Sequence, residues 1–108
     1  MIFITGGAFQ GKCEYAEKNY GNCNIVRNYH LIVKEQLKAG KDPIKEAEKF
    51  INENEDCVVT SDEMGCGIVP IDKFEREYRE VNGRVNCLLA KKAQNVVRVV
   101  CGIGSIIK

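Results

Sequence analysis

The chain has 108 residues, of which 44% are hydrophobic and 29% are charged, and this composition indicates one folded domain over residues 1–108 rather than a disordered segment. Sixteen basic side chains balance fifteen acidic ones, and the net charge of +1 gives no electrostatic reason to expect a nucleic acid or a membrane surface as partner. The apolar runs are too short for a membrane span, and the first one is too short for a secretory signal, so we expect a cytoplasmic protein.

Apolar periodicity and turn residues predict strands and helices in alternation. In chain order, we expect a strand at 1–5, a helix at 12–20, a strand at 23–27 and helices at 29–38 and 43–52, the latter with Asp42 as N-cap. A strand at 57–61, a glycine-rich loop at 62–70, a helix at 71–93, a strand at 95–101 and a short strand at 105–107 follow. Strands separated by helices predict an α/β fold with a mostly parallel sheet of four or five strands and helices on both faces.

The Asn82-Gly83 pair inside the last helix also resembles a hairpin turn. The apolar stripe keeps helical spacing through this pair, so we expect an uninterrupted helix at a cost of about 1 kcal/mol for the interior glycine. Such a glycine often allows another backbone to approach closely.

The segment between the first strand and the first helix contains Gly6-Gly7-Ala8-Phe9-Gln10-Gly11-Lys12-Cys13. It follows the pattern G-x-x-x-x-G-K-[ST], in which the N–H groups of a glycine-rich loop and of the next helix bind phosphate. We expect residues 6–13 to bind the phosphates of a nucleotide, and Lys12 to act catalytically on the outer phosphates. A glycine turn with a solvated lysine is the weaker alternative, because a strand and a helix flank the motif in the required order.

Cys13 occupies the position where this pattern has a hydroxyl that contacts magnesium. Magnesium prefers oxygen ligands, and a thiol is a poor substitute. We therefore expect ATP or GTP to bind, with Mg²⁺ held weakly, through water, at the Cys13 position. The substitution weakens the case for metal-assisted transfer from that nucleotide.

Asp62 and Glu63 follow a buried-type strand, at the sheet edge where a doubly wound fold binds its ligands. Either carboxylate is a candidate to hold magnesium through water or to accept a proton from an attacking hydroxyl; a solvated acidic turn is an equally good interpretation. Arg76 and Arg79 share a helix face and are candidate phosphate ligands, although pairing with nearby glutamates is slightly favoured.

Six cysteines are many for this length, and none falls in a C-x-x-C pair, so a zinc or redox site is poorly supported. We expect reduced thiols, with Cys57 and Cys101 acting as small core hydrophobes, rather than a disulfide framework.

Taken in order, these motifs resemble the bifunctional adenosylcobinamide kinase / adenosylcobinamide-phosphate guanylyltransferase family. The resemblance covers the first fifth and about the last half of the chain, and it rests on Gly6-Gly7-Ala8-x-x-Gly11-Lys12, Ala16-Glu17, Glu63-x-Gly65-x-Gly67-Ile68-Val69-Pro70, Arg76-x-x-Arg79, Gly83-Arg84-Val85-Asn86, Leu89-Ala90, Val100-x-Gly102 and the terminal Lys108. The resemblance implies a P-loop NTPase-like fold and a homo-oligomer. It also implies ATP or GTP as the phosphate donor and the hydroxyl of a corrinoid side chain, such as that of adenosylcobinamide, as the phosphate acceptor. Lys12 and Glu63 would then have catalytic roles.

The chain also departs from that family. Full members carry a basic segment, with the histidine that takes the guanylyl group, between the second strand and the next one. This chain lacks such a segment, and His30, its single histidine, has no arginine-rich surroundings, so we do not assign it that role. The aspartate expected nearby is replaced by Arg27 or Asn28, and Cys87 replaces a glutamine. Two hypotheses remain: a kinase without guanylyltransferase activity, or an inactive nucleotide- or phosphate-binding module.

Overall fold

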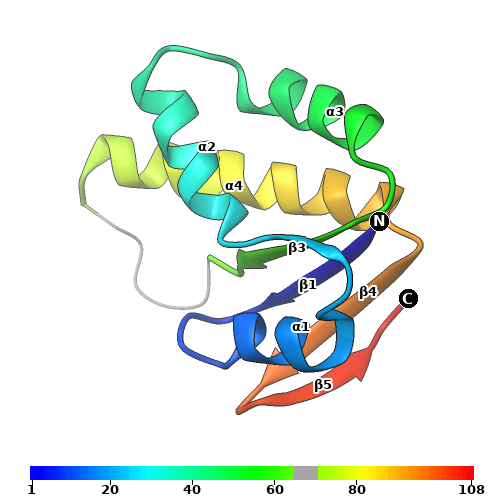
Figure 1. The fold of residues 1–108 in the computed structure, drawn as a ribbon. Helices are drawn as coiled ribbons and strands as arrows, with labels where there is room; N and C mark the ends of the chain where they lie inside the picture. Colours follow the sequence, from blue (N-terminus) through cyan, green and yellow to red (C-terminus); the bar gives the residue numbers. More distant parts are fainter. Residues whose placement is uncertain (65–70) are drawn as a thin grey trace.

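A computed structural model of the chain describes residues 1–64 and 71–108. In this part of the chain five strands form one sheet in the order β2-β3-β1-β4-β5, in which β2, β3, β1 and β4 are parallel and β5 is antiparallel to β4 (Figure 1). The elements are β1 (Ile2–Gly6), α1 (Lys12–Tyr20), β2 (Asn24–Val26), α2 (Tyr29–Lys38), α3 (Pro43–Glu53), β3 (Cys57–Asp62), α4 (Lys73–Lys92), β4 (Asn95–Val100) and β5 (Ile103–Ile106). The expected α/β fold is confirmed, and the arrangement is consistent with a P-loop-like fold.

Helices cover both faces of the sheet, as predicted. α1 packs on one face, whereas α2, α3 and α4 pack on the other (Figure 1). Successive side chains along a strand point to opposite faces of the sheet. Ile4 and Val58 therefore belong to the core beneath α1, whereas Phe3 and Val59 belong to the larger core on the opposite face. The central strands are apolar on both faces because both faces are buried.

Side chains cap two of the helices. Asp42 accepts hydrogen bonds from the N–H groups of Ile44 and Lys45 and thereby begins α3 as expected. Asp72 accepts one from the N–H of Glu75 and begins α4. By contrast, α1 begins after Gly11 with no side-chain cap. The N–H groups of its first turn are therefore left for water or for a ligand.

α4 continues through Gly83 without interruption, which confirms the helix prediction. A Cβ atom placed on Gly83 would meet no atom of residues 1–64 or 71–108 within 4 Å outside its own helix backbone and chain neighbours. No backbone of another described segment approaches Gly83 closely.

The C-terminal end differs from the prediction. Cys101 and Gly102 both have positive φ angles, 51° and 78°, and they turn the chain back so that β5 pairs with β4 from Ile103 onward. Cys101 therefore lies exposed in this turn, and its assignment to the core was wrong; Cys57 is buried as expected. Cys13, Cys23, Cys57, Cys87 and Cys101, which are the cysteines that the structure describes, are free thiols.

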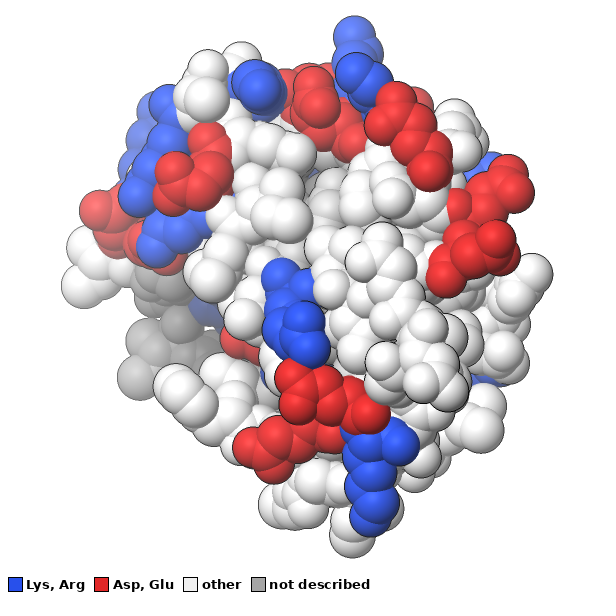
Figure 2. Space-filling model, viewed as in Figure 1, with Lys and Arg blue, Asp and Glu red and all other residues white. Residues whose placement is uncertain are grey.

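On the face drawn in Figure 2, acidic and basic side chains lie next to one another around the margin and at the lower centre, with uncharged side chains between them, and neither charge forms a patch of its own. Among the helices of residues 1–64 and 71–108, none has the length and apolarity that a membrane crossing requires.

Candidate functional site

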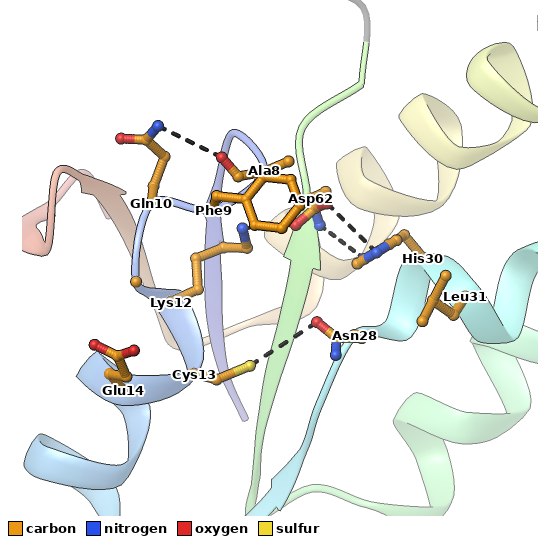
Figure 3. A pocket seen from close by; sticks show the side chains of 11 residues that line it. Ala8, Phe9, Gln10, Lys12, Cys13, Glu14, Asn28, His30, Leu31 and Asp62 are labelled. Atoms are coloured by element: carbon orange, nitrogen blue, oxygen red, sulfur yellow. Dashed lines mark hydrogen bonds and ion pairs between the residues drawn. The ribbon is translucent and has the colours of Figure 1, made fainter.

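A cavity of about 380 Å³ opens at the carboxyl edge of the parallel strands, between the loop after β1 and the first turn of α2 (Figure 3). Four elements contribute to it: the loop, the start of α1, the start of α2 and the end of β3. Its lining consists of Ala8, Phe9, Gln10, Gly11, Lys12, Cys13, Glu14, Asn28, His30, Leu31 and Asp62. Most of the predicted phosphate-binding residues therefore share one cavity.

Two glycines make the loop possible. Gly6 has φ 148°, and a Cβ atom there would collide with the carbonyl oxygen of Val99 on β4. Gly11 has φ 89° in the left-handed region, where a side chain is strained, and it leads directly into α1. The loop is also attached to the β4–β5 turn, because the Gln10 carbonyl accepts the N–H of Gly102 at 2.7 Å. The sequence thus places a tight turn at the uncapped N-terminus of a helix, where the helix dipole favours an anion.

Lys12 carries the positive charge of the cavity. Its side chain is only 5% exposed, and its ammonium donates to the Gly7 carbonyl at 2.7 Å and pairs with Asp62 Oδ1 at 2.6 Å. A buried ammonium needs such partners because the loss of water would otherwise cost several kcal/mol. Asp62, at the end of β3, is therefore the counter-charge of Lys12.

His30 also contacts Asp62, and sequence analysis did not include it among the candidate site residues. Its Nδ1 accepts the backbone N–H of Asp62 at 3.1 Å, and its Nε2 lies 3.4 Å from Asp62 Oδ2. Burial lowers the pKa of His30, Asp62 opposes this effect, and Lys12 adds to it. The neutral imidazole therefore carries its proton on Nε2, facing the carboxylate. A position just after a parallel strand was the only sequence signal for this residue.

Tyr78 of α4, which packs on the same face of the sheet as α2, supports the first turn of α2. Its hydroxyl donates to the carbonyl oxygen of His30 at 2.6 Å. Burial, with smaller contributions from Asp62 and Glu75, raises the pKa of Tyr78 to about 12. The hydroxyl therefore stays protonated at physiological pH and keeps the first turn of α2 in place.

The thiol of Cys13 lies next to a buried hydroxyl. Its Sγ is 3.7 Å from Thr60 Oγ1 and 3.9 Å from Asn28 Oδ1, and Thr60 Oγ1 accepts the N–H of Asn28 at 2.9 Å. Asn28 has φ 56°, which directs the chain from β2 into α2. Sequence analysis did not single out Thr60 or assign a role to Asn28, because a polar residue inside an apolar strand carries no signal of its partner.

The remaining candidates lie apart from the cavity lining. Glu63 pairs with Arg98 at 3.3 Å, and its N–H donates to the Gly6 carbonyl at 2.8 Å. Arg76 donates to the Ile71 carbonyl at 3.0 Å in the first turn of α4. Neither Arg76 nor Arg79 lines the cavity, so their contact with phosphate stays a prediction. The motif over residues 65–70 lies outside the described residues.

The described side chains alone do not form a complete metal site. Within residues 1–64 and 71–108, no three His, Cys, Asp or Glu side chains come together so that they could hold a metal ion. Asp62 offers one carboxylate in the cavity, whereas Cys13 offers sulfur. A hard cation here would therefore depend on water and phosphate oxygens for most of its ligands.

Residues 24–107 match the family model described as "Cobinamide kinase / cobinamide phosphate guanyltransferase". This match covers more than half of the chain and does not include the loop after β1. A stretch of 51 residues is 47% identical to the "Bifunctional adenosylcobalamin biosynthesis protein CobU" of Salmonella typhimurium and, equally, to the protein of that name from Escherichia coli. The stretch is 47% of this chain but only 28% of each relative.

Proposed function

Because this chain belongs to the cobinamide kinase / cobinamide phosphate guanyltransferase family, we propose that residues 1–108 act as one nucleotide-binding domain that transfers phosphate from ATP or GTP to the hydroxyl of a corrinoid side chain. The observation that carries this proposal is the buried Lys12 ammonium in a cavity at the uncapped N-terminus of α1. A cation, free N–H groups and the positive end of a helix dipole all favour a polyphosphate at the same place.

Lys12 has the main electrostatic role in this mechanism. Its ammonium pairs with Asp62 Oδ1 at 2.6 Å. A bound nucleotide offers phosphate oxygens to the same ammonium, and the charge that develops on the transferred phosphoryl group is stabilised there. The acceptor oxygen bonds to the terminal phosphorus while the bond to the bridging oxygen breaks and the nucleoside diphosphate leaves.

Asp62 is positioned to take the proton that the acceptor hydroxyl loses. It lies in the cavity beside Lys12, and His30 Nε2 faces its second oxygen at 3.4 Å. The neutral imidazole holds the carboxylate in place and adds no second positive charge. Glu63, the other candidate carboxylate and the one to which the family resemblance gives a catalytic role, pairs with Arg98 and does not line the cavity, so Asp62 is the better candidate.

Magnesium fits this site only in part. The carboxylate of Asp62 is a suitable ligand, whereas the Cys13 thiol is not. Bound Mg²⁺ would neutralise charge on the phosphate oxygens. Asp62 would hold it together with the nucleotide and water. The hydroxyl of Thr60 lies 3.7 Å from Cys13 Sγ.

We propose further that guanylyltransferase activity is absent. His30 engages both ring nitrogens with Asp62, which leaves neither nitrogen free to attack a nucleotide. Incubation with GTP labelled in the α-phosphate should leave no acid-labile GMP on the protein. Stoichiometric labelling would contradict this statement.

The second candidate function is a nucleotide- or phosphate-binding module without transfer, and the thiol at position 13 favours it. A transfer assay separates the two: labelled terminal phosphate from ATP or GTP should appear on adenosylcobinamide with wild-type protein but not with Lys12→Ala. Nucleotide binding without any labelled corrinoid would select the binding module. Assembly into a homo-oligomer stays a prediction for either function.

A further inference from the structure

The end of β3 extends beyond one of its two neighbouring strands. β2 pairs with β3 up to Val59, whereas β1 pairs with it up to Asp62. The N–H of Glu63 donates to the carbonyl of Gly6 on β1 at 2.8 Å. Since successive peptide groups of a strand point to opposite sides, the N–H and C=O of Asp62 point away from β1. Within residues 1–64 and 71–108, no strand pairs with them on that side.

Side chains from two helices bind these peptide groups instead of a strand. The N–H of Asp62 donates to Nδ1 of His30 on α2 at 3.1 Å. Its carbonyl oxygen accepts two hydrogen bonds from α4, one from Asn82 Nδ2 at 3.2 Å and one from Asn86 Nδ2 at 3.0 Å. A single donor would satisfy the carbonyl, whereas two donors one helical turn apart engage both of its lone pairs. The direction of the Asp62 peptide is therefore fixed from α4.

Asn82 does not suit the part of α4 in which it lies. It belongs to a buried stripe of that helix together with Tyr78, Val85 and Leu89, and its exposed fraction is 0%. The Oδ1 atoms of Asn82 and Asn86 have no hydrogen-bond partner among the described residues. A buried polar atom without a partner lowers stability, and a leucine of similar size would continue the apolar stripe. Core packing alone therefore does not explain an asparagine at this position.

The sheet is polar at the same place. Thr5 on β1 and Ser61 on β3 lie opposite each other in the register, and both are buried. They follow Phe3 and Val59 by two residues, so their side chains point to the same core beneath α4. Their hydroxyl oxygens also lack a partner in the part of the chain that the structure describes. Polar side chains thus replace apolar ones at the end of this core that adjoins Asp62, and such departures from the apolar pattern are typical of functional sites.

We propose that Asn82 and Asn86 are positioning residues, which fix the peptide of Asp62 and thereby hold its carboxylate in the cavity. The carboxylate lies 2.6 Å from Lys12 Nζ, and Figure 3 shows its contact with His30 Nε2, at 3.4 Å. A displacement of about 1 Å at reacting groups lowers a rate by up to about 100-fold. The inference rests on the proposed function where transfer is concerned, because it takes Asp62 as the group that accepts the proton of the acceptor hydroxyl.

Inorganic triphosphate is a probe that needs no turnover, because it competes with Asp62 for the Lys12 ammonium. Calorimetry compares its affinity for wild type, Asn82→Leu, Asn86→Leu and the double variant. Leucine has nearly the size of asparagine but donates no hydrogen bond from its side chain. A less firmly held carboxylate competes less well for Lys12, so triphosphate should bind several-fold more tightly to each single variant and most tightly to the double variant.

Two controls separate positioning from a general loosening of the fold. Asn54→Leu removes an equivalent hydrogen bond just before β3, where the Asn54 amide donates to the Phe50 carbonyl at 2.9 Å, and this variant should bind triphosphate like wild type. In an Asp62→Asn background, Asn82→Leu and Asn86→Leu should leave the triphosphate affinity unchanged, because the carboxylate that they displace is absent. Asn82→Leu should also unfold at a urea concentration no lower than wild type, since it removes a half-paired amide from the core.

Tighter triphosphate binding that is confined to chains with Asp62 would support the positioning role. Wild-type affinity in the single and double asparagine variants would overturn it. An affinity change that persists in the Asp62→Asn background would overturn it as well, because the amides would then act on the cavity through the fold as a whole. A lower urea midpoint for Asn82→Leu with unchanged triphosphate affinity would give the amide a structural role instead.

Phosphate transfer to adenosylcobinamide separates this inference from the proposed function. Asn86→Leu should lower kcat about tenfold or more and leave the KM for nucleotide at or below the wild-type value. If wild type transfers no phosphate but the triphosphate affinities follow the expected pattern, the positioning role stands and the kinase activity fails. If wild type transfers phosphate and Asn82→Leu and Asn86→Leu keep its kcat, the kinase stands and the positioning role fails.

Discussion

The Lys12–Asp62 pair makes Asp62→Asn an informative substitution. The change keeps the size of the side chain but leaves the Lys12 ammonium, 5% exposed, without the carboxylate at 2.6 Å. Removal of one partner from a buried pair costs about 3–5 kcal/mol. Lys12 keeps its hydrogen bond to the Gly7 carbonyl, and Asp62 is 18% exposed. We therefore expect a smaller loss, about 2–3 kcal/mol of unfolding free energy, measured by urea denaturation at pH 7.

Glu63→Gln is the matched control for stability, because it makes the same chemical change one residue further along. The Glu63–Arg98 pair lies at 3.3 Å, with side chains 30% and 51% exposed, so its loss should cost less than about 0.5 kcal/mol. Asp62→Asn should also bind inorganic triphosphate more tightly than wild type, since the carboxylate no longer competes for Lys12. Equal stability losses in the two variants, together with unchanged triphosphate affinity, would refute the view that Asp62 is the counter-charge of a phosphate-binding lysine.

Three further predictions concern the same region. Cys13→Ser should make ATP affinity several-fold more dependent on Mg²⁺ in calorimetric titrations, because a hydroxyl replaces a poor magnesium ligand; an unchanged dependence would place the metal elsewhere. Burial lowers the pKa of His30, so the stabilisation that the neutral imidazole provides is complete above pH 6.5 and is lost as the pH falls through the lowered pKa. The unfolding free energy of wild type should therefore fall more between pH 7 and pH 5 than that of His30→Gln. Parallel stability curves for the two proteins would argue against a buried neutral imidazole. Gly6→Ala should lower the unfolding free energy by about 2 kcal/mol or more, because the new Cβ collides with the backbone of Val99. Gly83→Ala should raise it by up to about 1 kcal/mol, because alanine favours the helix and meets no described neighbour there. Similar melting temperatures for the two variants would contradict this interpretation of the two glycines.

Sequence patterns predicted the architecture well wherever local chemistry decides it. The apolar run at residues 57–61 and the Asp42-Pro43 helix start each depend on neighbouring residues, and the structure has β3 and α3 there. The C-terminal turn was missed because Cys101 adopts a positive φ, and the residues beside it in the sequence do not predict that conformation. Its apolar context suggested core, whereas the reversal of the chain exposes it.

The candidate site, like the fold, was predicted from the sequence only where its residues lie close together in the chain. The loop at residues 8–13 was found because its residues are consecutive, and they line one cavity. Asp62 was chosen together with Glu63 from a strand end, and only the fold shows that their side chains meet different partners, Lys12 and Arg98. His30 was missed because its role comes from a contact 32 positions away in the sequence. Contacts of this kind are set by the register of parallel strands, which a single sequence does not specify.

The most direct test of a phosphate-binding loop with Lys12 at its centre is a calorimetric titration of ATP and GTP into wild type, Lys12→Ala and Lys18→Ala. Lys18 is an exposed lysine in the last turn of α1 and controls for the loss of one positive charge from the same helix. Wild type and Lys18→Ala should bind nucleotide with similar affinity, and Lys12→Ala should bind at least about tenfold more weakly, the loss of one charge-assisted contact to phosphate. Equal affinity in all three proteins would contradict the account.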